Sequence, residues 1–396
     1  MRLLHMVHTL NPARGGPSES VRMFVLAHQR AGNQVEVATL DAPGSGYESL
    51  VNCEVHPRGP GFRNYGYSPR LEHWLRANFR RFDGVIVNGV WQFHGVVARR
   101  VLAGRTPYVV FAHGMLDPYF MRRHPLKHLK KLAYWMVSER LNLNRAQAVC
   151  FTSEEEKRIA GEGFPLRRFR GVVVPYGTPG PSGEPEALKA AFFASLPALQ
   201  GKPYLLFLGR IHPKKGCDLL IEAFAQAAPQ NMQLVMAGPD ETGWRPQLEA
   251  LAGRLGVADR VHWTGMVRGD AKWGALYAAE AFVLPSHQEN FGIAVADALA
   301  CAAIPLISNQ VNIAPDVAKD GAGLVEPDTL DGTRRLIARF LAMSSAECSQ
   351  MRERALACYR SRYALTNAAV AVYRAMGLPE RERRRSDGAG GVSLRA

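Results

Sequence analysis

Short apolar segments alternate with longer amphipathic segments along this chain, a pattern that predicts strands alternating with helices. In the first half, the segments expected to form strands are 3–7, 35–40, 84–90, 108–112, 148–152 and 172–174. The segments expected to form helices are 19–31, 93–103, 126–143 and 154–161.

A segment rich in proline and glycine, 176–185, follows and predicts a linker. Beyond it the same alternation starts again. Strands are expected at 204–208, 233–237, 261–263, 281–284, 305–308 and 323–325, and helices at 218–228, 246–255, 271–279 and 293–302. One long helix, over roughly 346–376, is expected to close the folded part of the chain.

The expected strands are apolar throughout, which is typical of parallel sheets covered by helices on both faces. We therefore expect an α/β protein with two doubly wound, Rossmann-like domains that face each other across a cleft. The expected divisions are 1–178 for the N-terminal domain, 179–200 for a linker and the first helix of the second half, 201–345 for the C-terminal domain, 346–378 for a closing helical segment and 379–396 for a disordered tail.

Composition and cysteine usage favour a cytoplasmic enzyme. Of the 396 residues, 47% are hydrophobic and 21% charged, as in a globular protein, and no apolar run approaches the roughly 18 residues that a membrane span requires. The opening residues, 1–8, are too few and too polar for a secretory signal. The six cysteines show no Cys-x-x-Cys spacing, which indicates reduced thiols in a cytosolic protein.

The net charge of +14 is unevenly distributed. Residues 1–180 contain 25 Lys/Arg and 13 Asp/Glu, giving +12, whereas the remainder contains 24 and 22, giving +2. A basic half suggests an anionic partner. Nucleic acid is not expected, because no helix-turn-helix, zinc-finger or aromatic RNA-binding signature accompanies the charge. An anionic membrane surface is the other candidate.

The segment 121–147 is basic, aromatic and helical in period, which bears on that candidate. One face of the expected helix carries Leu126, Leu129, Leu132 and Ala133, and the other carries Lys127, Lys130 and Lys131. Two interpretations stay open. The helix packs on the core with a solvated basic face, or it lies on a membrane surface with Tyr134 and Trp135 at the depth of the lipid headgroups.

Carboxylates follow the expected strand 281–284 in a way that favours binding of a hydroxyl-rich ligand. The polar loop after this strand carries Glu289, and the apolar helix after the loop presents Asp297. In open α/β sheets, ligands bind outside the carboxyl ends of the strands. Hydroxyl groups need acceptors such as carboxylates, and the amides at a helix N-terminus attract anions.

A second loop, 209–216, is a candidate phosphate clamp. It carries Arg210, a planar bidentate donor, and Lys215, a mobile point charge, between a strand and a helix. It does not match the P-loop pattern, and no Gly-x-Gly-x-x-Gly follows a strand. By itself the loop is equally explained as a solvated basic surface, but its pairing with the Glu289 loop in one sheet favours phosphate binding.

Two loops in the first half also follow strands. Gly15 and Gly16 precede a proline and a serine and predict a helix N-terminus with unobstructed amides, although an ordinary tight turn fits the same residues. His113 and Gly114 come directly after the strand 108–112. This position favours a site residue over a structural histidine.

The order of these motifs resembles the retaining, nucleotide-sugar-dependent glycosyltransferases of family four, the glycosyl transferases group 1, which have the GT-B fold. The matching pieces are Gly15-Gly16, His113-Gly114, Gly209-Arg210, Lys215-Gly216, Ala237-Gly238, Thr264-Gly265, and Ser286 through Ala300 followed by Ile304-Pro305-Leu306-Ile307. They span about residues 3 to 325, in the order and at the spacing of the family.

The resemblance implies a role for each matching residue. Arg210 and Lys215 would bind the donor diphosphate, Glu289 would bind sugar hydroxyls, and His113 would lie near the reacting carbon. The further donor-binding residues that it implies are Gly15, Gly16, Gly265, Asn290, Phe291, Gly292 and Asp297.

One position departs from the family pattern. The family usually has a second glutamate where this chain has Asp297, and that carboxylate typically bonds the ribose of the donor. The shorter side chain puts the ribose contact in doubt more than the chemistry. A degenerate, non-catalytic partner subunit therefore stays open.

The function expected from the resemblance is transfer of a sugar from a nucleoside diphosphate sugar to a glycan or lipid-linked acceptor with retention of configuration, in cell-envelope or exopolysaccharide assembly. No Asp-x-Asp occurs in the chain, so neither a metal nor another cofactor is expected. No carboxylate lies in the segment 113–116, which favours a front-face, oxocarbenium-like substitution over a double displacement. The rival enzyme is a GT-B nucleotide-sugar 2-epimerase. We expect a cytoplasmic protein, peripheral on the inner face of the plasma membrane.

Overall fold

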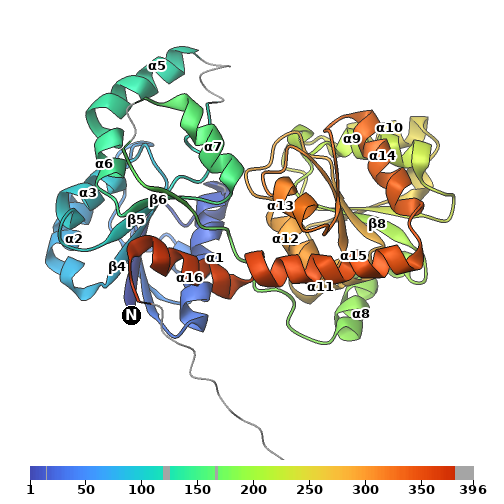
Figure 1. The fold of residues 1–396 in the computed structure, drawn as a ribbon, viewed down its shortest axis with the longest axis horizontal. Helices are drawn as coiled ribbons and strands as arrows, with labels where there is room; N and C mark the ends of the chain where they lie inside the picture. The colour runs from blue at the N-terminus through green and yellow to red at the C-terminus, as the bar shows by residue number, and fades with distance from the viewer. Residues whose placement is uncertain (15, 119–124, 166–167, 380–396) are drawn as a thin grey trace, which may run out of the picture.

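The computed structural model describes residues 1–14, 16–118, 125–165 and 168–379, which form two α/β domains side by side (Figure 1). The N-terminal sheet has seven parallel strands in the order β3-β2-β1-β4-β5-β6-β7. These strands are β1 (Arg2–Val7), β2 (Gln34–Thr39), β3 (Glu54–Pro57), β4 (Gly84–Asn88), β5 (Tyr108–Phe111), β6 (Ala148–Phe151) and β7 (Gly171–Val173).

Helices cover both faces of this sheet. They are α1 (Gly16–Arg30), α2 (Pro69–Asn78), α3 (Phe93–Leu102), α5 (Pro125–Tyr134), α6 (Arg140–Asn144) and α7 (Glu154–Gly163). A short π-helix, η4 (Trp135–Glu139), joins α5 to α6, so that the expected helix 126–143 is continuous but locally wider.

The C-terminal sheet has six parallel strands in the order β10-β9-β8-β11-β12-β13. The strands are β8 (Tyr204–Leu208), β9 (Gln233–Ala237), β10 (Val261–Gly265), β11 (Ala281–Leu284), β12 (Ile304–Ser308) and β13 (Leu324–Glu326). The helices of this domain are α8 (Pro185–Ser195), α9 (Cys217–Ala227), α10 (Arg245–Arg254), α11 (Gly269–Ala278), α12 (Ile293–Ala300), α13 (Ala314–Lys319), α14 (Leu330–Leu341) and α15 (Ser345–Cys358). The last helix, α16 (Leu365–Met376), returns to the N-terminal domain.

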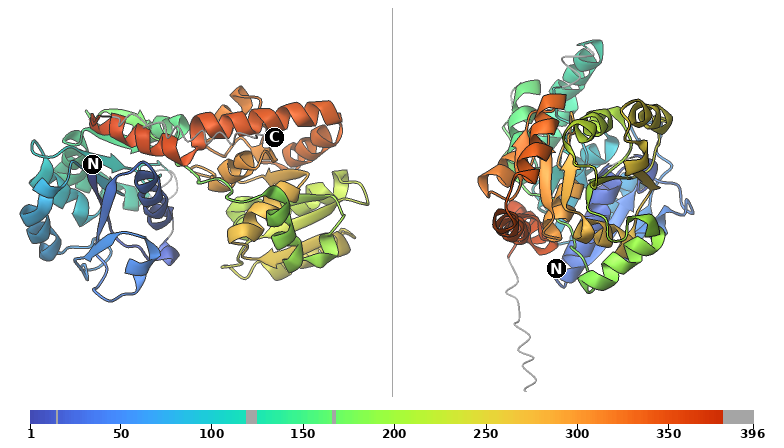
Figure 2. Two further views of the ribbon diagram at one scale, coloured as in Figure 1. Left: turned by 90° about the horizontal axis from the view of Figure 1, so that it is seen from below. Right: turned by 90° about the vertical axis from the view of Figure 1, so that its right-hand side faces the viewer.

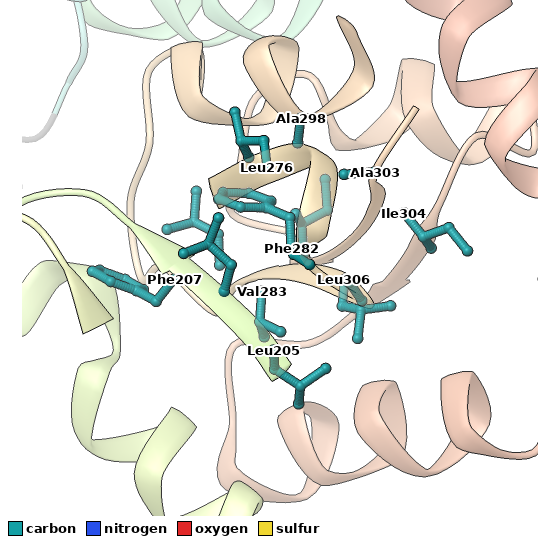
Figure 3. Packing of buried hydrophobic residues seen from close by; sticks show 14 of the residues in the cluster. Leu205, Phe207, Leu276, Phe282, Val283, Ala298, Ala303, Ile304 and Leu306 are labelled. Atoms are coloured by element: carbon teal, nitrogen blue, oxygen red, sulfur yellow. The ribbon is translucent and has the colours of Figure 1, made fainter. Parts of the chain in front are cut away.

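The central strands are buried on both faces, as their wholly apolar sequences predict. Figure 3 shows the packing in the C-terminal domain, where Phe282 of β11 lies among Leu276, Ala298 and Ala303. Small alanine side chains let helix α12 approach the sheet closely around this large ring. The expected α/β fold with two doubly wound parallel sheets is confirmed.

In each sheet the strand order reverses direction at one place, between β1 and β4 in the first domain and between β8 and β11 in the second. Adjacent connections leave the sheet in opposite directions at such a place, and a crevice opens outside the carboxyl ends of the strands. The loops with Gly16, Lys215 and Glu289 follow β1, β8 and β11, which flank these switch points, and the loop with His113 follows β5, next to β4.

The chain crosses between the domains twice, at neighbouring positions. Thr178 in the linker pairs with Ala364 as an isolated parallel bridge, and its amide donates to the carbonyl of Tyr363 at 3.0 Å. Helix α15 lies on the C-terminal domain, whereas Ala368 and Val372 of α16 pack in the core of the N-terminal domain. Figure 2 shows both helices along one side of the two domains.

The prediction of one long helix over 346–376 is therefore wrong in detail. A π-helix (Tyr359–Tyr363) follows α15, and Ala364 is extended, with φ −63° and ψ 139°, before α16 begins. The break is where the chain returns to the first domain. In the parts of the chain that the structure describes, no helix is both long enough and apolar enough to cross a bilayer.

Candidate active site

Lys215 and Glu289, 74 positions apart in sequence, form an ion pair at the switch point of the C-terminal sheet. Lys215 ends a short 3₁₀ helix (Pro213–Lys215) after β8, and Glu289 lies in the loop after β11. Their side chains are only 17% and 20% exposed. The loop predicted for phosphate and the loop predicted for sugar hydroxyls thus meet through their charged groups.

Burial, with a smaller contribution from repulsion by the nearby Arg210, lowers the pKa of Lys215 to about 8. Arg210 itself is exposed and makes an ion pair of 3.0 Å with Glu241. The cationic loop therefore has one sheltered ammonium group and one guanidinium in contact with water.

Two glycines allow the close backbone approaches on which this loop depends. Gly216 has φ 65°, and a Cβ there would lie 2.4 Å from the carbonyl oxygen of Pro285 at the end of β11. A Cβ on Gly238 would lie 1.7 Å from the carbonyl oxygen of Gly209. Gly265 ends β10, two strands from β8, and accepts from the amide of Gly238 at 2.8 Å. No described contact links Gly265 to the Lys215–Glu289 pair.

His113 follows β5 in the left-handed region, with φ 50°, and both of its ring nitrogens have partners. Nδ1 contacts the hydroxyl of Tyr176, and Nε2 lies 3.3 Å from Oδ1 of Asn88. Burial, with a smaller contribution from His94, lowers the pKa of His113 to about 3. A neutral imidazole with a proton on Nε2 satisfies both contacts, since the tyrosine hydroxyl then donates to Nδ1.

Glu156 fixes the loop that contains His113 and was not predicted from the sequence. One carboxylate oxygen accepts from the amide of Gly114 at 2.5 Å, and the other accepts from the amide and hydroxyl of Thr152 at 2.6 and 2.7 Å. Burial raises the pKa of Glu156. In the sequence this residue is one of three consecutive glutamates at a helix start, a pattern that indicates helix stabilisation and not a buried anchor.

Asn290 connects the two halves of the site. Its amide nitrogen lies 3.4 Å from the hydroxyl of Thr152, and a Cβ on Gly114 would come within 2.9 Å of its side-chain oxygen. The residue next to Glu289 therefore touches the His113–Gly114 loop of the other domain. The loops after β5 and β11 are in direct contact here.

Phe291 and Gly292 lead from this loop into α12. The Phe291 ring is buried and packs edge-on against Tyr176, with the ring centroids 5.2 Å apart. Gly292 has φ 91° at the N-cap of α12. Gly16 begins α1 after β1, and a Cβ there would meet no atom within 4 Å. Gly15 lies outside the described residues.

Asp297 is bound within the protein. Its carboxylate accepts from the hydroxyl of Thr178 in the linker and from the ammonium group of Lys272 at 3.0 Å. The side chain is 8% exposed. The structure thus gives this carboxylate two protein partners at the crossing between the domains, and its expected ribose contact stays a prediction.

The candidate membrane helix presents its apolar side to solvent. Leu126 and Leu129 are 83% and 63% exposed, whereas Leu132 packs against the core of the N-terminal domain. Packing of this face on the core is therefore wrong for Leu126 and Leu129 and right for Leu132. Val137, in the following π-helix, is 72% exposed. Trp135 is fully buried, and its indole nitrogen donates to the carbonyl of Pro165 at 2.8 Å. The expectation that Trp135 reaches lipid headgroups is therefore also wrong, because this side chain belongs to the domain core.

The described residues include one group of side chains spaced to hold a metal ion, Glu36, Glu54 and His56, and it lies on β2 and β3. Glu36 already accepts from Arg2 at 2.6 Å and contacts His56 at 2.7 Å. This group is an ion-pair network within the sheet.

Two family models match the chain. The model of glycosyl transferases group 1 matches residues 189–357, and that of a glycosyl transferase 4-like domain matches residues 15–177. The alpha-D-kanosaminyltransferase of Streptomyces kanamyceticus is 27% identical over 394 residues, which cover 94% of this chain and 95% of that protein. The GDP-mannose:cellobiosyl-diphosphopolyprenol alpha-mannosyltransferase of Xanthomonas oryzae is 25% identical, covering 92% and 93%.

Among solved structures, that of Anabaena HepE in complex with UDP superposes with a TM-score of 0.74 at 16% identity, covering 95% of this chain and all of that one, and it supports the fold alone. The two family models follow one another along the chain, one in each domain. Together they include the candidate site residues after β1, β5, β8 and β11. The chain therefore belongs to the group 1 glycosyltransferases with the GT-B fold.

Proposed function

We propose that this glycosyltransferase takes a sugar from a nucleoside diphosphate sugar and transfers it, with retention of configuration, to a lipid-linked or otherwise amphiphilic acceptor. The observation that carries the proposal is the ion pair of Lys215 and Glu289 at the switch point of the second sheet. The two groups neutralise each other when no donor is bound, and a donor offers each a new partner.

A diphosphate is the natural partner for Lys215, and a sugar hydroxyl is the natural partner for Glu289. As phosphate oxygens displace Glu289 from the ammonium group, the released carboxylate accepts hydrogen bonds from the sugar. Lys215 and Arg210 then stabilise negative charge on the departing diphosphate. Anabaena HepE binds UDP, and the Xanthomonas relative is named for GDP-mannose, which supports a nucleotide sugar as the donor.

The surroundings of His113 support a front-face substitution. Glu156 is one carboxylate that reaches this loop, but each of its oxygens accepts a hydrogen bond from the protein backbone. The other, Asp117, lies later in the loop and accepts from the side-chain amide of Gln288 at 3.5 Å. An attack by Glu156 on the sugar would leave the amides of Gly114 and Thr152 without acceptors in a buried place. The diphosphate itself, still held by Lys215, is then the base that takes the acceptor proton.

The exposed apolar face of α5 and the following turns supports an amphiphilic acceptor. Its exposed side chains are Leu126, Leu129, Met136, Val137 and Leu141. Lys130 and Lys131 lie on the same helix, so the surface combines apolar and cationic groups as membrane-surface helices do. The Xanthomonas relative acts, by its name, on a diphosphopolyprenol-linked acceptor. A role in glycan assembly on the inner face of the plasma membrane is consistent with these features.

The donor is tested first by thermal unfolding with UDP, GDP and ADP and then with their sugars. A ligand that binds only the native state raises the apparent stability with the logarithm of its concentration over its dissociation constant. We expect one nucleotide to raise the melting temperature, and its sugar to be hydrolysed slowly without acceptor to the sugar of unchanged stereochemistry at carbon 2.

Three outcomes contradict the proposal. Conversion of the donor sugar to its carbon-2 epimer would identify an epimerase. Absence of stabilisation and turnover with every donor would identify an inactive partner. With a synthetic amphiphilic acceptor, nuclear magnetic resonance of the product reads the anomeric configuration directly, and an inverted product would refute retention.

A further inference from the structure

A cavity of about 550 Å³ lies outside the candidate active site, where β3 ends and α2 begins. The residues that shape it are Pro43, Pro57, Arg58, Arg70, His73 and Trp74. Because β3 is the edge strand of the sheet, the cavity is two strands away from the β1–β4 switch point. It is therefore distinct from the donor and reaction-centre loops.

The ionisable side chains that line this cavity are Arg58, Arg70 and His73, and no carboxylate is among the lining residues. Glu72 on the same helix is held elsewhere, since it pairs with Arg76 at 2.7 Å and with Arg100 at 3.2 Å. The walls therefore supply no carboxylate that would neutralise Arg58 or Arg70, whose guanidinium group donates, within the described part of the chain, only to the carbonyl of Gly59 at 3.4 Å. The potential beside these two groups favours an anion.

Arg58 is positioned for a ligand that the protein does not supply. Its Nε is buried and has no hydrogen-bond partner among the described residues. Its backbone is fixed on both sides, because its amide donates to Thr39 at 2.8 Å and its carbonyl accepts from the hydroxyl of Ser68 at 2.5 Å. A buried donor without an acceptor costs free energy. An anion that draws the guanidinium group toward the cavity would supply the missing acceptor.

The opposite wall combines charge with a flat apolar surface. Arg70, His73 and Trp74 follow one another at positions i, i+3 and i+4 of α2 and so share one face of the helix. The Arg58 guanidinium lies 5.2 Å from the centroid of the Trp74 ring, which holds it beside that surface. Prolines complete an apolar lining around the cationic groups.

We propose that this cavity is a binding site for a small organic anion. Arg58 and Arg70 hold its phosphate or carboxylate group, and its apolar part packs against Trp74 and Pro57. The site stands independently of the proposed function, since it shares no residue with the donor loops.

Calorimetric titration with phenyl phosphate, benzoate and benzyl alcohol tests this site. The full chain with Arg210→Ala and Lys215→Ala serves as the background, because these changes remove anion binding by the donor loop. We expect phenyl phosphate to bind at one site and to lose at least about tenfold in affinity with either Arg58→Gln or Arg70→Gln, since a hydrogen bond to a charged group contributes about 1.5–3 kcal/mol. Arg70 is exposed, so its variant should fold even if that of Arg58 does not.

Arg76→Gln is the matched control, because it removes the same charge from the same helix outside the cavity. Equal affinity for benzoate would show that any organic anion is accepted, and weaker affinity would show a preference for phosphate. The proposal is refuted if neither anion binds, if benzyl alcohol binds as tightly as phenyl phosphate, or if the Arg76 variant loses as much affinity as the Arg70 variant.

Discussion

The carboxylate of Asp297 accepts a hydrogen bond from the hydroxyl of Thr178, 119 positions earlier in the chain. This bond joins helix α12, which carries the donor-side loop at its start, to the linker at the point where the chain crosses between the domains. Lys272 on α11 provides a second contact to the same carboxylate, at 3.0 Å. A residue expected to bind the ribose is thus also placed to hold the linker against the C-terminal domain.

The first prediction concerns this contact. Asp297→Ala leaves the Lys272 ammonium and the Thr178 hydroxyl without their partner, and we expect the free energy of unfolding to fall by about 2–3 kcal/mol. Thr178→Val should cost less, since it removes only the neutral group. A double-mutant cycle measured by denaturant unfolding should give a coupling of at least about 0.5 kcal/mol, and purely additive effects would contradict a direct contact.

The same variant separates the linker role from the ribose contact. If Asp297 acts through the linker, Asp297→Ala changes the affinities for UDP and for inorganic pyrophosphate by the same factor, because pyrophosphate has no ribose. A selective loss of UDP affinity would establish that the shorter carboxylate still reaches the ribose.

The second prediction is that Lys215→Ala reduces turnover by about 10²–10³-fold while the fold is retained, because one group that stabilises transition-state charge is lost. Arg210→Ala should also reduce turnover severely. Lys214→Ala is the control, since it removes an identical charge one position away, and most activity should remain. Retention of more than a third of the wild-type turnover by both the Lys215 and Arg210 variants would exclude the diphosphate role.

The third prediction follows from the pKa of Lys215, which burial lowers to about 8 in the free enzyme. A bound diphosphate stabilises the charged ammonium and raises this pKa. Donor affinity is therefore highest below pH 8. It falls as the pH rises above 8, by up to about tenfold per pH unit. Calorimetry of UDP binding between about pH 7 and pH 9.5 should show this fall in the wild type but not in Lys215→Ala. A pH-independent affinity in the wild type would contradict it.

Much of the fold could be predicted because the central strands are buried on both faces and so contain only apolar residues. The strand β3 (Glu54–Pro57) was not predicted, since an edge strand of four residues with His56 and Pro57 has no apolar pattern. Helix α2 was missed for a similar reason, because few of its residues are buried. The helix breaks at Ala364 because the chain returns there to the N-terminal domain. A local sequence pattern does not indicate where that domain lies.

The candidate site, too, could be predicted only in part. Lys215 and Glu289 could be predicted because each lies in the segment between a strand and the next helix, and parallel strands bring their carboxyl ends to one edge. The partners that fix the site, among them Glu156, Thr178 and Lys272, come from distant segments, and their contacts exist only after the domains have packed. Long-range hydrogen bonds of this kind leave no periodic signal in a sequence.

The fourth prediction tests the anchor of the His113 loop. Glu156→Ala removes the acceptor for the amides of Gly114 and Thr152, and we expect a loss of about 3 kcal/mol in stability together with lower turnover. Glu155→Ala on the same helix is the control, because its partner Arg158 lies at the surface, and its effect should stay within about 0.5 kcal/mol. Equal losses of stability in the two variants would show that Glu156 stabilises the protein no more than the surface residue Glu155 does.

The last prediction concerns the exposed apolar face of α5. We expect the protein to sediment with liposomes to an extent that rises with their content of anionic lipid and falls with salt, because each lysine or arginine near an anionic surface contributes about 1 kcal/mol and salt screens it within roughly 10 Å.

Leu126→Glu and Leu129→Glu should reduce this binding strongly, since each places a charge in the surface that would enter the interface. Leu255→Glu is the matched control, because Leu255 is also exposed but lies in the C-terminal domain after α10, and its variant should bind as the wild type does. Two results would contradict membrane attachment through this face. One is wild-type liposome binding that changes with neither lipid charge nor salt, and the other is an equal loss of liposome binding in all three variants. Either result would favour a soluble acceptor.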